Sequence, residues 1–202
     1  MEAATEGLGV RVCGELKLRM MFDNPDALRM YEVCARYGLP VVVHIDYPIP
    51  TGSGSPLRPD FWYGGGIEPF ERAVKRCPRT IFLGHGPGFW AHISGDDQFL
   101  TSVYPKGHVQ KGGEVSRLLR ECPNLFADLS ANSARNAITR DRGFGREFLI
   151  EFQDRLLFAR DCFTDALHRT LLEFDLPAKV LEKILSGNAL RLVPECNNGN
   201  GS

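Results

Sequence analysis

Three side chains with metal-binding and acid–base capacity each end a short apolar segment of the sequence. His44 ends VVVH, His85 ends IFLGH and Asp161 ends LLFARD. Two imidazoles and a carboxylate suit a divalent transition metal, with zinc as the first candidate. Each residue also has an ordinary alternative, since a histidine after a strand can bond a loop and Asp161 can cap the segment that follows. Their equivalent places predict one metal site formed by His44, His85 and Asp161.

A pair of opposite charges lies inside another apolar segment, VRVCGELKL. Strand alternation places Glu15 and Lys17 on one face together with Cys13. Charges that point into a barrel are costly unless they are paired with each other, with a metal or with a substrate. Two hypotheses therefore stand side by side: an ion pair between Glu15 and Lys17 without a catalytic role, or two substrate-binding side chains.

Ser130 and His92 are further candidates for substrate binding. Ser130 ends the apolar segment NLFADLS, and its hydroxyl could contact a substrate or hold the next loop in place. His92 lies in GFWAHISGD, where it could line a pocket or have a structural role. The residue types alone leave both alternatives open at each position.

The apolar segments that carry these residues are separated by stretches with helical periodicity. Apolar residues recur at i, i+3, i+4 and i+7 and stop at glycine or proline, which predicts helices. The expected strands are 10–18, 41–44, 81–85, 125–130 and 156–161, and the expected helices are 24–38, 70–77, 115–122, 146–152 and 177–193. This alternation predicts an α/β fold in which helices cover a parallel sheet.

The connections in this predicted fold differ greatly in length. Those from helix to strand are very short, whereas residues 46–67 and 86–112 form long connections from strand to helix. In parallel α/β folds the functional loops lie at the carboxyl ends of the strands. The difference therefore indicates a functional site at that edge, with decorative loops as the alternative.

The composition and the missing motifs exclude several classes of protein. The 202 residues carry 24 basic and 25 acidic side chains. This nearly neutral net charge gives no overall electrostatic attraction to nucleic acid or to an anionic membrane. No apolar run fits a transmembrane helix or a signal peptide. The six cysteines form no C-x-x-C pair, which predicts reduced thiols and a cytoplasmic protein. G-x-S-x-G, G-x-G-x-x-G, Walker A and H-E-x-x-H are all absent.

The order of these segments resembles the amidohydrolase superfamily, in its metal-dependent, amidohydrolase-2-like branch of TIM-barrel fold. The matching segments are GELKL, LPVVVHID, IFLGHGPGFW, NLFADLSANSARNAITRD, DRLLFARD and KILSGNALRLV. The resemblance implies a partial (βα)8 barrel over residues 1–194. It would contain about five parallel strands, equivalent to strands four to eight, with covering helices. Residues 195–202 would form a disordered polar tail.

The resemblance also implies a role for each candidate. His44 would be a metal ligand, His85 a metal ligand or an acid–base group, and Asp161 both a ligand and the general base. Glu15 would lie where members place a metal-bridging or substrate-facing group. The implied function is metal-dependent hydrolysis of a C–N or C–O bond in a small molecule by activated water, with a divalent metal such as zinc as cofactor. A nonoxidative decarboxylase on the same scaffold is the alternative.

Two departures from the family pattern bear on activity. The family's H-x-H motif, which ends the first strand and supplies two ligands, is absent, so we expect the first three strands to be missing. FARD stands where the family has F-G-S/T-D, and Arg160 could pair with Asp161 or face solvent. We therefore expect weak zinc binding with little or no turnover, and a non-catalytic barrel fragment is a third hypothesis. Two exposed sheet edges, near Cys13 and Phe158, would invite self-association.

Overall fold

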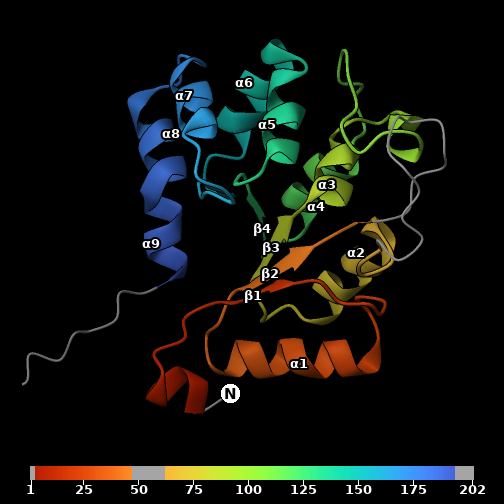
Figure 1. The fold of residues 1–202 in the computed structure, drawn as a ribbon, viewed down its shortest axis with the longest axis vertical. Coiled ribbons are helices and arrows are strands. Elements are labelled where there is room, and N and C mark those ends of the chain that lie inside the picture. Colours follow the sequence, from red (N-terminus) through yellow and green to blue (C-terminus); the bar gives the residue numbers. More distant parts are fainter. Residues whose placement is uncertain (1–2, 47–61, 194–202) are drawn as a thin grey trace, which may run out of the picture.

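Five strands form a single parallel sheet in the computed structural model, which describes residues 3–46 and 62–193 (Figure 1). The strands are β1 (Cys13–Leu16), β2 (Val41–His44), β3 (Phe82–His85), β4 (Leu125–Asp128) and β5 (Leu156–Leu157). They lie side by side in chain order. The predicted α/β fold with five parallel strands is therefore confirmed, as an open sheet with β1 and β5 at its edges in the described part of the chain. The expected tail at 195–202 lies outside the described residues.

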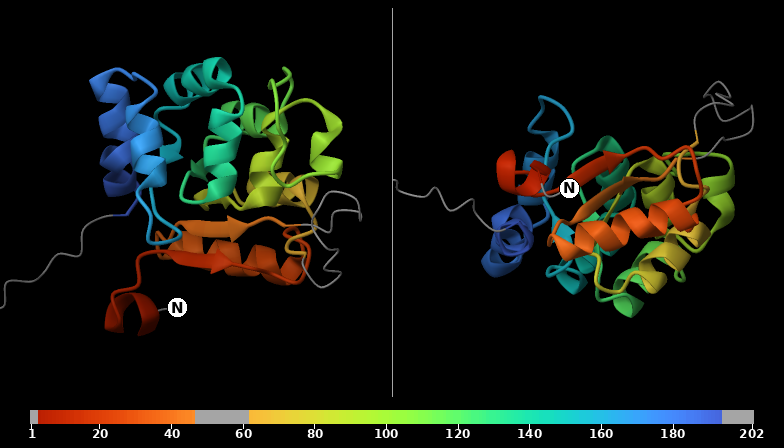
Figure 2. Two further views of the ribbon diagram at one scale, coloured as in Figure 1. Left: turned by 45° about the horizontal axis from the view of Figure 1, so that its top comes forward. Right: turned by 90° about the horizontal axis from the view of Figure 1, so that it is seen from below.

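Helices cover the sheet and connect its strands. The α-helices are α1 (Pro25–Arg36), α2 (Ile67–Arg76), α3 (Pro87–Trp90), α4 (Glu114–Glu121), α5 (Asn132–Thr139), α6 (Arg142–Glu151), α7 (Ala166–Leu172), α8 (Ala178–Glu182) and α9 (Asn188–Leu192). Shorter turns of helix are η1 (Ala3–Gly7), η2 (Ala91–Ile93), η3 (Asp97–Leu100) and η4 (Lys183–Gly187). Figures 1 and 2 show α1 along the β1 end of the sheet and α7, α8 and α9 gathered at the opposite end. Within the described ranges, none of the helices has the length and apolar character that crossing a membrane requires.

Capping residues explain where several helices begin. The Asn24 side chain accepts a hydrogen bond from the Asp26 backbone N–H at 2.9 Å, and Pro25 is the first residue of α1. Asp141 caps α6 in the same way through the Phe144 backbone N–H at 3.2 Å. The sequence does not predict α5 or α7, which are short helices of eight and seven residues. These two helices depend on their packing in the folded chain.

Side chains of the sheet alternate between two apolar layers. One face belongs to the large core beneath the helices, and its members include Val41, Val43, Phe82, Leu125 and Leu156. The other face carries the smaller cluster of Leu83, Phe126 and Leu157. Because side-chain direction repeats every second residue, His85 lies on the same face as Leu83 and Asp128 on the same face as Phe126. This second face therefore changes from apolar to polar toward the carboxyl ends of the strands.

Buried hydrogen bonds hold the opposite, amino ends of the strands. Asn124 precedes β4, and its Nδ2 donates to the carbonyls of Val74, Cys77 and Thr80 at 3.1, 3.1 and 3.0 Å. These bonds join the start of β4 to the end of α2 and to the turn after it. Polar residues at this edge of a parallel α/β sheet serve stability, whereas polar residues at the carboxyl edge serve function.

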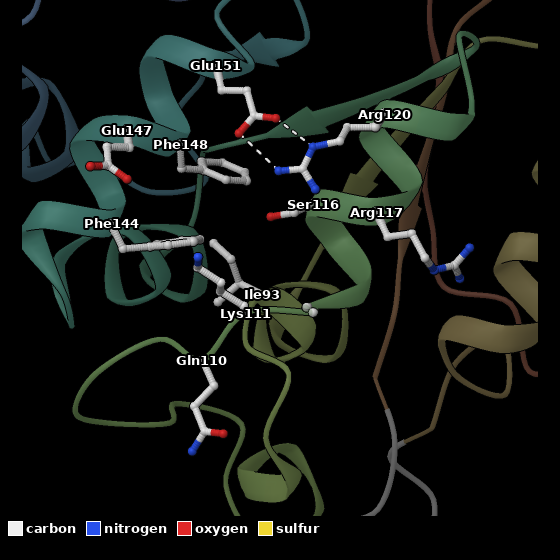
Figure 3. Close-up of a pocket in the computed structure, with 12 residues that line it drawn as sticks. Ile93, Gln110, Lys111, Ser116, Arg117, Arg120, Phe144, Glu147, Phe148 and Glu151 are labelled. Carbon is white, nitrogen blue, oxygen red and sulfur yellow. Dashed lines mark hydrogen bonds and ion pairs between the residues drawn. The ribbon is translucent and has the colours of Figure 1, made fainter.

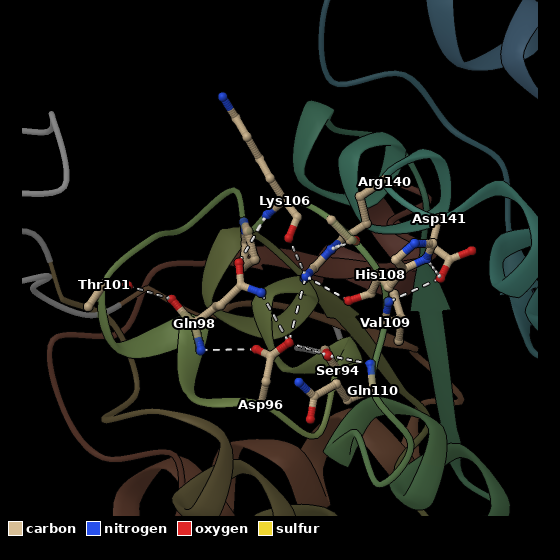
Figure 4. A network of polar contacts seen from close by, with 12 residues as sticks. Ser94, Asp96, Gln98, Thr101, Lys106, His108, Val109, Gln110, Arg140 and Asp141 are labelled. Atoms are coloured by element: carbon tan, nitrogen blue, oxygen red, sulfur yellow. Dashed lines mark hydrogen bonds and ion pairs between the residues drawn. The ribbon is translucent and has the colours of Figure 1, made fainter.

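A buried arginine anchors the long connection between β3 and α4 (Figure 4). Arg140 follows α5, its side chain is only 2% exposed, and it donates to the carbonyls of Lys106 (2.8 Å), Gly107 (2.9 Å) and His108 (3.3 Å). Burial lowers the pKa of Arg140, while the nearby charge of Asp96 opposes this shift. The hydrogen bonds of Arg140 therefore attach this connection to the end of α5.

Candidate metal centre

Three adjacent strands bring two imidazoles and a carboxylate together at the carboxyl edge of the sheet. Glu15 of β1, His44 of β2 and His85 of β3 each offer one donor atom, and these atoms all lie within 4.8 Å of one another. His44 and His85 are register partners in the parallel β2–β3 pair, which places their rings side by side with centroids 5.2 Å apart. The meeting of these residues therefore follows directly from the strand register.

Glu15 is the common partner of both histidines. Its Oε1 accepts a hydrogen bond from His44 Nδ1 and lies 3.3 Å from His85 Nε2, while its Oε2 lies 3.2 Å from Lys17 Nζ. The preceding residue, Gly14, has a φ of 145°, and a Cβ there would stand 2.7 Å from the Val42 carbonyl oxygen. Glycine thus permits the close approach of β1 to β2 that brings Glu15 to the histidines.

Asp128 and Ser130 set the orientation of the His85 ring. Asp128 Oδ2 lies 3.0 Å from His85 Nδ1 and accepts a hydrogen bond from the Ser130 hydroxyl at 2.8 Å. The Ser130 backbone N–H donates to the other oxygen of Asp128 at 2.8 Å. A carboxylate on Nδ1 leaves Nε2 of His85 directed at Glu15, and a carboxylate behind a histidine is the usual support of a metal ligand.

The charges at this edge shift the pKa values of Glu15 and His85 in opposite directions. Burial raises the pKa of Glu15, but hydrogen bonds from His44 and Lys17 and the charges of the two histidines outweigh it, so this pKa lies below its usual value. Burial lowers the pKa of His85, but the hydrogen bond to Asp128 and the charges of Asp128, Glu15 and Asp161 outweigh it, so this pKa is raised. Glu15 is thus kept ionised by its cationic neighbours, and the ionised carboxylate is the form that binds a cation, whereas His85 lies among negative charges.

The residues present fit a divalent metal. Two imidazole nitrogens and one carboxylate oxygen are a donor set used by catalytic zinc sites, which keep a further position open for water or substrate. The three donors already converge around Glu15 Oε1, and Asp128 supports one of the histidines from behind. The same nitrogen and oxygen donors also suit manganese, so the donor types do not distinguish the two metals.

The sequence-predicted ligand Asp161 lies beside this group and not within it. Asp161 is exposed, and its backbone N–H donates to the Ser130 carbonyl at 3.3 Å. Among the described residues, the metal-binding group consists of Glu15, His44 and His85. Asp161 is near enough for its charge to raise the pKa of His85. Its neighbour Arg160 is exposed and lines a separate hollow of about 260 Å³ with His168 and two other residues.

The other predicted site residues take different positions. Lys17 forms an ion pair with Glu15, which is one of the two alternatives left open by the sequence, and its side chain is about half exposed. Ser130 lies behind His85, with its hydroxyl 3.3 Å from Nδ1. His92 is buried in η2, where its Nδ1 lies 2.7 Å from the Gly88 carbonyl oxygen. Burial lowers the pKa of His92 despite that hydrogen bond.

Two acidic residues outside the predicted metal site also lie at this edge of the sheet. Asp128 contacts His85, and Asp46 Oδ2 lies 3.6 Å from His44 Nε2. Both follow the apolar part of their strand segments, as the histidines do, so the strand-end pattern could have identified them. What distinguishes Asp128 is its cross-strand contact, which the sequence does not display.

Comparison with known proteins gives one family and several structures of similar fold. The amidohydrolase family model matches residues 1–194. A TIM-barrel protein from Bordetella bronchiseptica is 18% identical with a TM-score of 0.61, over 93% of this chain and 58% of that one. A dihydroxybenzoic acid decarboxylase from Polaromonas sp. JS666, with bound manganese and an inhibitor, is 17% identical with a TM-score of 0.51, over 95% and 63%. A 2,6-dihydroxybenzoate decarboxylase from Rhizobium is 18% identical with a TM-score of 0.50, over 95% and 64%.

These comparisons carry different weight. No curated protein sequence matches the chain. The similar structures are distant in sequence and show the fold alone, and this chain spans less than two thirds of each of the three. The family match is of another kind, since it covers nearly the whole sequence, including every residue of the metal-binding group. The chain therefore belongs to the amidohydrolase family.

Proposed function

We propose that the protein is a metal-dependent hydrolase of amidohydrolase type that acts on a C–N or C–O bond of a small molecule. The observation that carries the proposal is the convergence of Glu15, His44 and His85 at the carboxyl edge of a parallel sheet. This edge holds the active sites of TIM-barrel enzymes. Because the chain belongs to the amidohydrolase family, we interpret this group of side chains as the ligands of a divalent metal.

The proposed mechanism divides the work among the residues of the site. Glu15, His44 and His85 would hold a divalent metal, for which we favour zinc, and the metal would supply Lewis-acid polarisation of the scissile group. Asp161 acts as the general base that takes a proton from the attacking water and passes it to the leaving group. Asp128 keeps His85 in one orientation. Lys17, with His92 and Ser130 as further candidates, contacts the substrate.

A nonoxidative decarboxylase is the second candidate. It is favoured by the similarity of the fold to two solved dihydroxybenzoate decarboxylases, one of which contains manganese. Lys17 would then face a substrate carboxylate, because its ammonium is half exposed beside the metal-binding group. Assays of the metal-loaded protein separate the two reactions: an ester and amide panel reports hydrolysis, and CO2 release from 2,6-dihydroxybenzoate reports decarboxylation.

Zinc titration by calorimetry tests the ligand set. We expect binding weaker than that of a complete catalytic zinc site, with affinity lowered further in Glu15→Gln, His44→Ala and His85→Ala. Asp161→Asn is the matched test of the sequence-based hypothesis, because it removes a carboxylate at the same edge. If Asp161→Asn abolishes zinc binding and Glu15→Gln does not, Asp161 is the third ligand and the proposed set is wrong. If none of the four variants alters zinc binding, the metal-dependent function is wrong and the barrel-fragment hypothesis is favoured.

The remaining proposals concern partners and location. A small-molecule substrate follows from the enzyme-like fold and family. We propose self-association through the edges at β1 and β5, each of which pairs with one strand only in the described sheet. We also propose a cytoplasmic location, which the free thiols of Cys13, Cys34, Cys77, Cys122 and Cys162 support.

A further inference from the structure

A cavity of about 440 Å³ lies between α4 and α6, apart from the metal-binding group (Figure 3). The segment from Gln110 to Gly113, which leads from the β3–α4 connection into α4, forms its third side. None of the three residues of the metal-binding group lines the cavity. Its size falls within the range of small-molecule sites, so its chemistry decides what it could bind.

The inner part of the cavity is apolar. Ile93 and Phe148 are almost completely buried, at 1% and 2% exposed, and Phe144 stacks on Phe148 with ring centroids 5.9 Å apart. Two aromatic rings and a branched aliphatic side chain form a surface that packs well against another ring. The apolar part of a ligand would therefore be about the size of one ring.

A serine hydroxyl of α4 points into this space. The Ser116 side chain of α4 has no hydrogen-bond partner among the described residues, and the residue is only 8% exposed. Figure 3 shows its oxygen directed from α4 toward α6. This oxygen is not among the fully buried unpaired atoms of the described residues, so the hydroxyl is open to the cavity and can donate to a ligand acceptor. Gly113, which precedes α4, supplies no capping side chain, so the first backbone N–H groups of the helix add donors at the same end.

The charges around the cavity leave one cation available. Arg120 forms a two-bond ion pair with Glu151, and Arg117 is paired with Glu71 on the neighbouring α2. Lys111 also lines the cavity and has no ion-pair partner in the described ranges. Glu147 is a lining residue as well, but its carboxylate is directed away from the space between the helices (Figure 3).

We propose that this cavity binds a small monocarboxylate whose apolar body is the size of one ring. The carboxylate accepts hydrogen bonds from the Ser116 hydroxyl and the first N–H groups of α4 and pairs with Lys111. The ring packs on Ile93 and Phe148. Each group of the site then has a partner, and a ligand lacking either the anion or the ring loses one half of the interactions. This proposal is independent of the reaction at the metal centre.

Site-resolved NMR titration with benzoate tests the proposal on the full-length protein. We expect benzoate to shift the backbone amide signals of residues 113–116, and benzyl alcohol, the uncharged analogue of similar shape, to leave them in place. Ser116→Ala and Lys111→Met should each weaken benzoate binding about tenfold, the effect of one lost hydrogen bond to a charged group or of one ion pair. Lys179→Met, which removes an exposed lysine on α8, is the matched control and should bind benzoate like the unaltered protein.

Three results would overturn the proposal. The first is a benzoate titration that leaves residues 113–116 unshifted, whether or not other signals move. The second is equal binding of benzyl alcohol and benzoate, which would remove the role of the anion. The third is Lys111→Met binding benzoate as well as Lys179→Met does. Because Lys111 is exposed, its variant stays informative even if Ser116→Ala disturbs the packing of α4.

Discussion

His85 shows how single residues divide the work at the candidate metal centre. One ring nitrogen faces Glu15 and the other faces Asp128, so each nitrogen has a separate task. The carboxylate of Asp128 is itself held by both the hydroxyl and the backbone N–H of Ser130. The orientation of His85 therefore depends on β4, although the histidine belongs to β3.

The Asp128→Asn variant measures this dependence. We expect zinc affinity to fall about 10- to 100-fold, because loss of a supporting carboxylate weakens a metal ligand by that factor. Calorimetric titration gives the affinity. Asp165→Asn removes an exposed carboxylate that pairs with Arg169 and serves as the control, with affinity unchanged. Equal zinc affinity in both variants would show that Asp128 does not support the metal ligand.

At the scale of elements, the α5–α6 pair depends on a close approach at one glycine. A Cβ on Gly145 would stand 1.9 Å from the Ile138 carbonyl oxygen, so the two helices touch through backbone atoms. Gly143, one half-turn earlier on the same helix, has only a side-chain oxygen of Asp141 near its Cβ position, at 3.7 Å. The packing of α5 on α6 therefore requires glycine at position 145, whereas position 143 has room for a side chain.

Gly145→Ala and Gly143→Ala form a matched pair. We expect Gly145→Ala to lower the free energy of unfolding by about 1–3 kcal/mol, since α5 and α6 must separate to admit the methyl group. Gly143→Ala should leave it unchanged or raise it by up to about 1 kcal/mol through helix propensity. Urea unfolding measures both variants. The same loss in both would contradict the packing argument.

At the scale of the whole molecule, an ion-pair network joins the helices on the outside of the sheet. Arg117 of α4 donates to both carboxylate oxygens of Glu71 on α2 and also pairs with Glu114 and Glu121. The hydrogen bonds from Arg117 and Lys75 hold the pKa of Glu71 at about 2, although burial opposes the shift. A carboxyl group with a lowered pKa stabilises the folded state only while it is ionised.

This network predicts a stability loss in acid. The contribution of Glu71 to the free energy of unfolding is fully present above the usual pKa of a glutamate, near 4.5, and is lost as the pH falls toward about 2. We expect it to amount to about 1–2 kcal/mol because solvent screens the pair. The difference in unfolding free energy between the unaltered protein and Glu71→Gln should therefore shrink between pH 5 and pH 2. A difference that stays constant over this range would contradict the assignment.

The open sheet predicts association of the whole molecule. The outer edge of β1 pairs with no other strand in the described sheet and can pair with a strand of another molecule. The edge of β5 is partly covered, because Asn188 Nδ2 donates to the Leu156 carbonyl at 2.7 Å and the Phe158 N–H donates to the Ile184 carbonyl at 2.9 Å. We expect the sedimentation coefficient to rise with protein concentration. The same measurement at high salt is the control. Salt screens surface ion pairs but not backbone hydrogen bonds, so association through strand edges should persist. A monomeric coefficient at every concentration would contradict the prediction.

The sequence by itself determined where the strands lie along the chain and most of the residues that meet at the site. Apolar runs ending in His44 and His85 are a local pattern, and parallel strands bring their carboxyl ends to one edge. The strand segments that carry β1–β5 and the helices α1, α2, α4 and α6 were predictable for the same reason. They depend on periodicity and breakers that are written in consecutive residues.

Only the tertiary structure decided which carboxylate joins the two histidines. Alternation left Glu15 between an ion pair and a substrate role, and its place beside His44 and His85 required the close approach of β1 to β2 at Gly14. Asp128 gained its role because the β3–β4 register sets it against His85. Both contacts join residues far apart in the chain, and their geometry depends on register and backbone spacing, which no local pattern of residue types specifies.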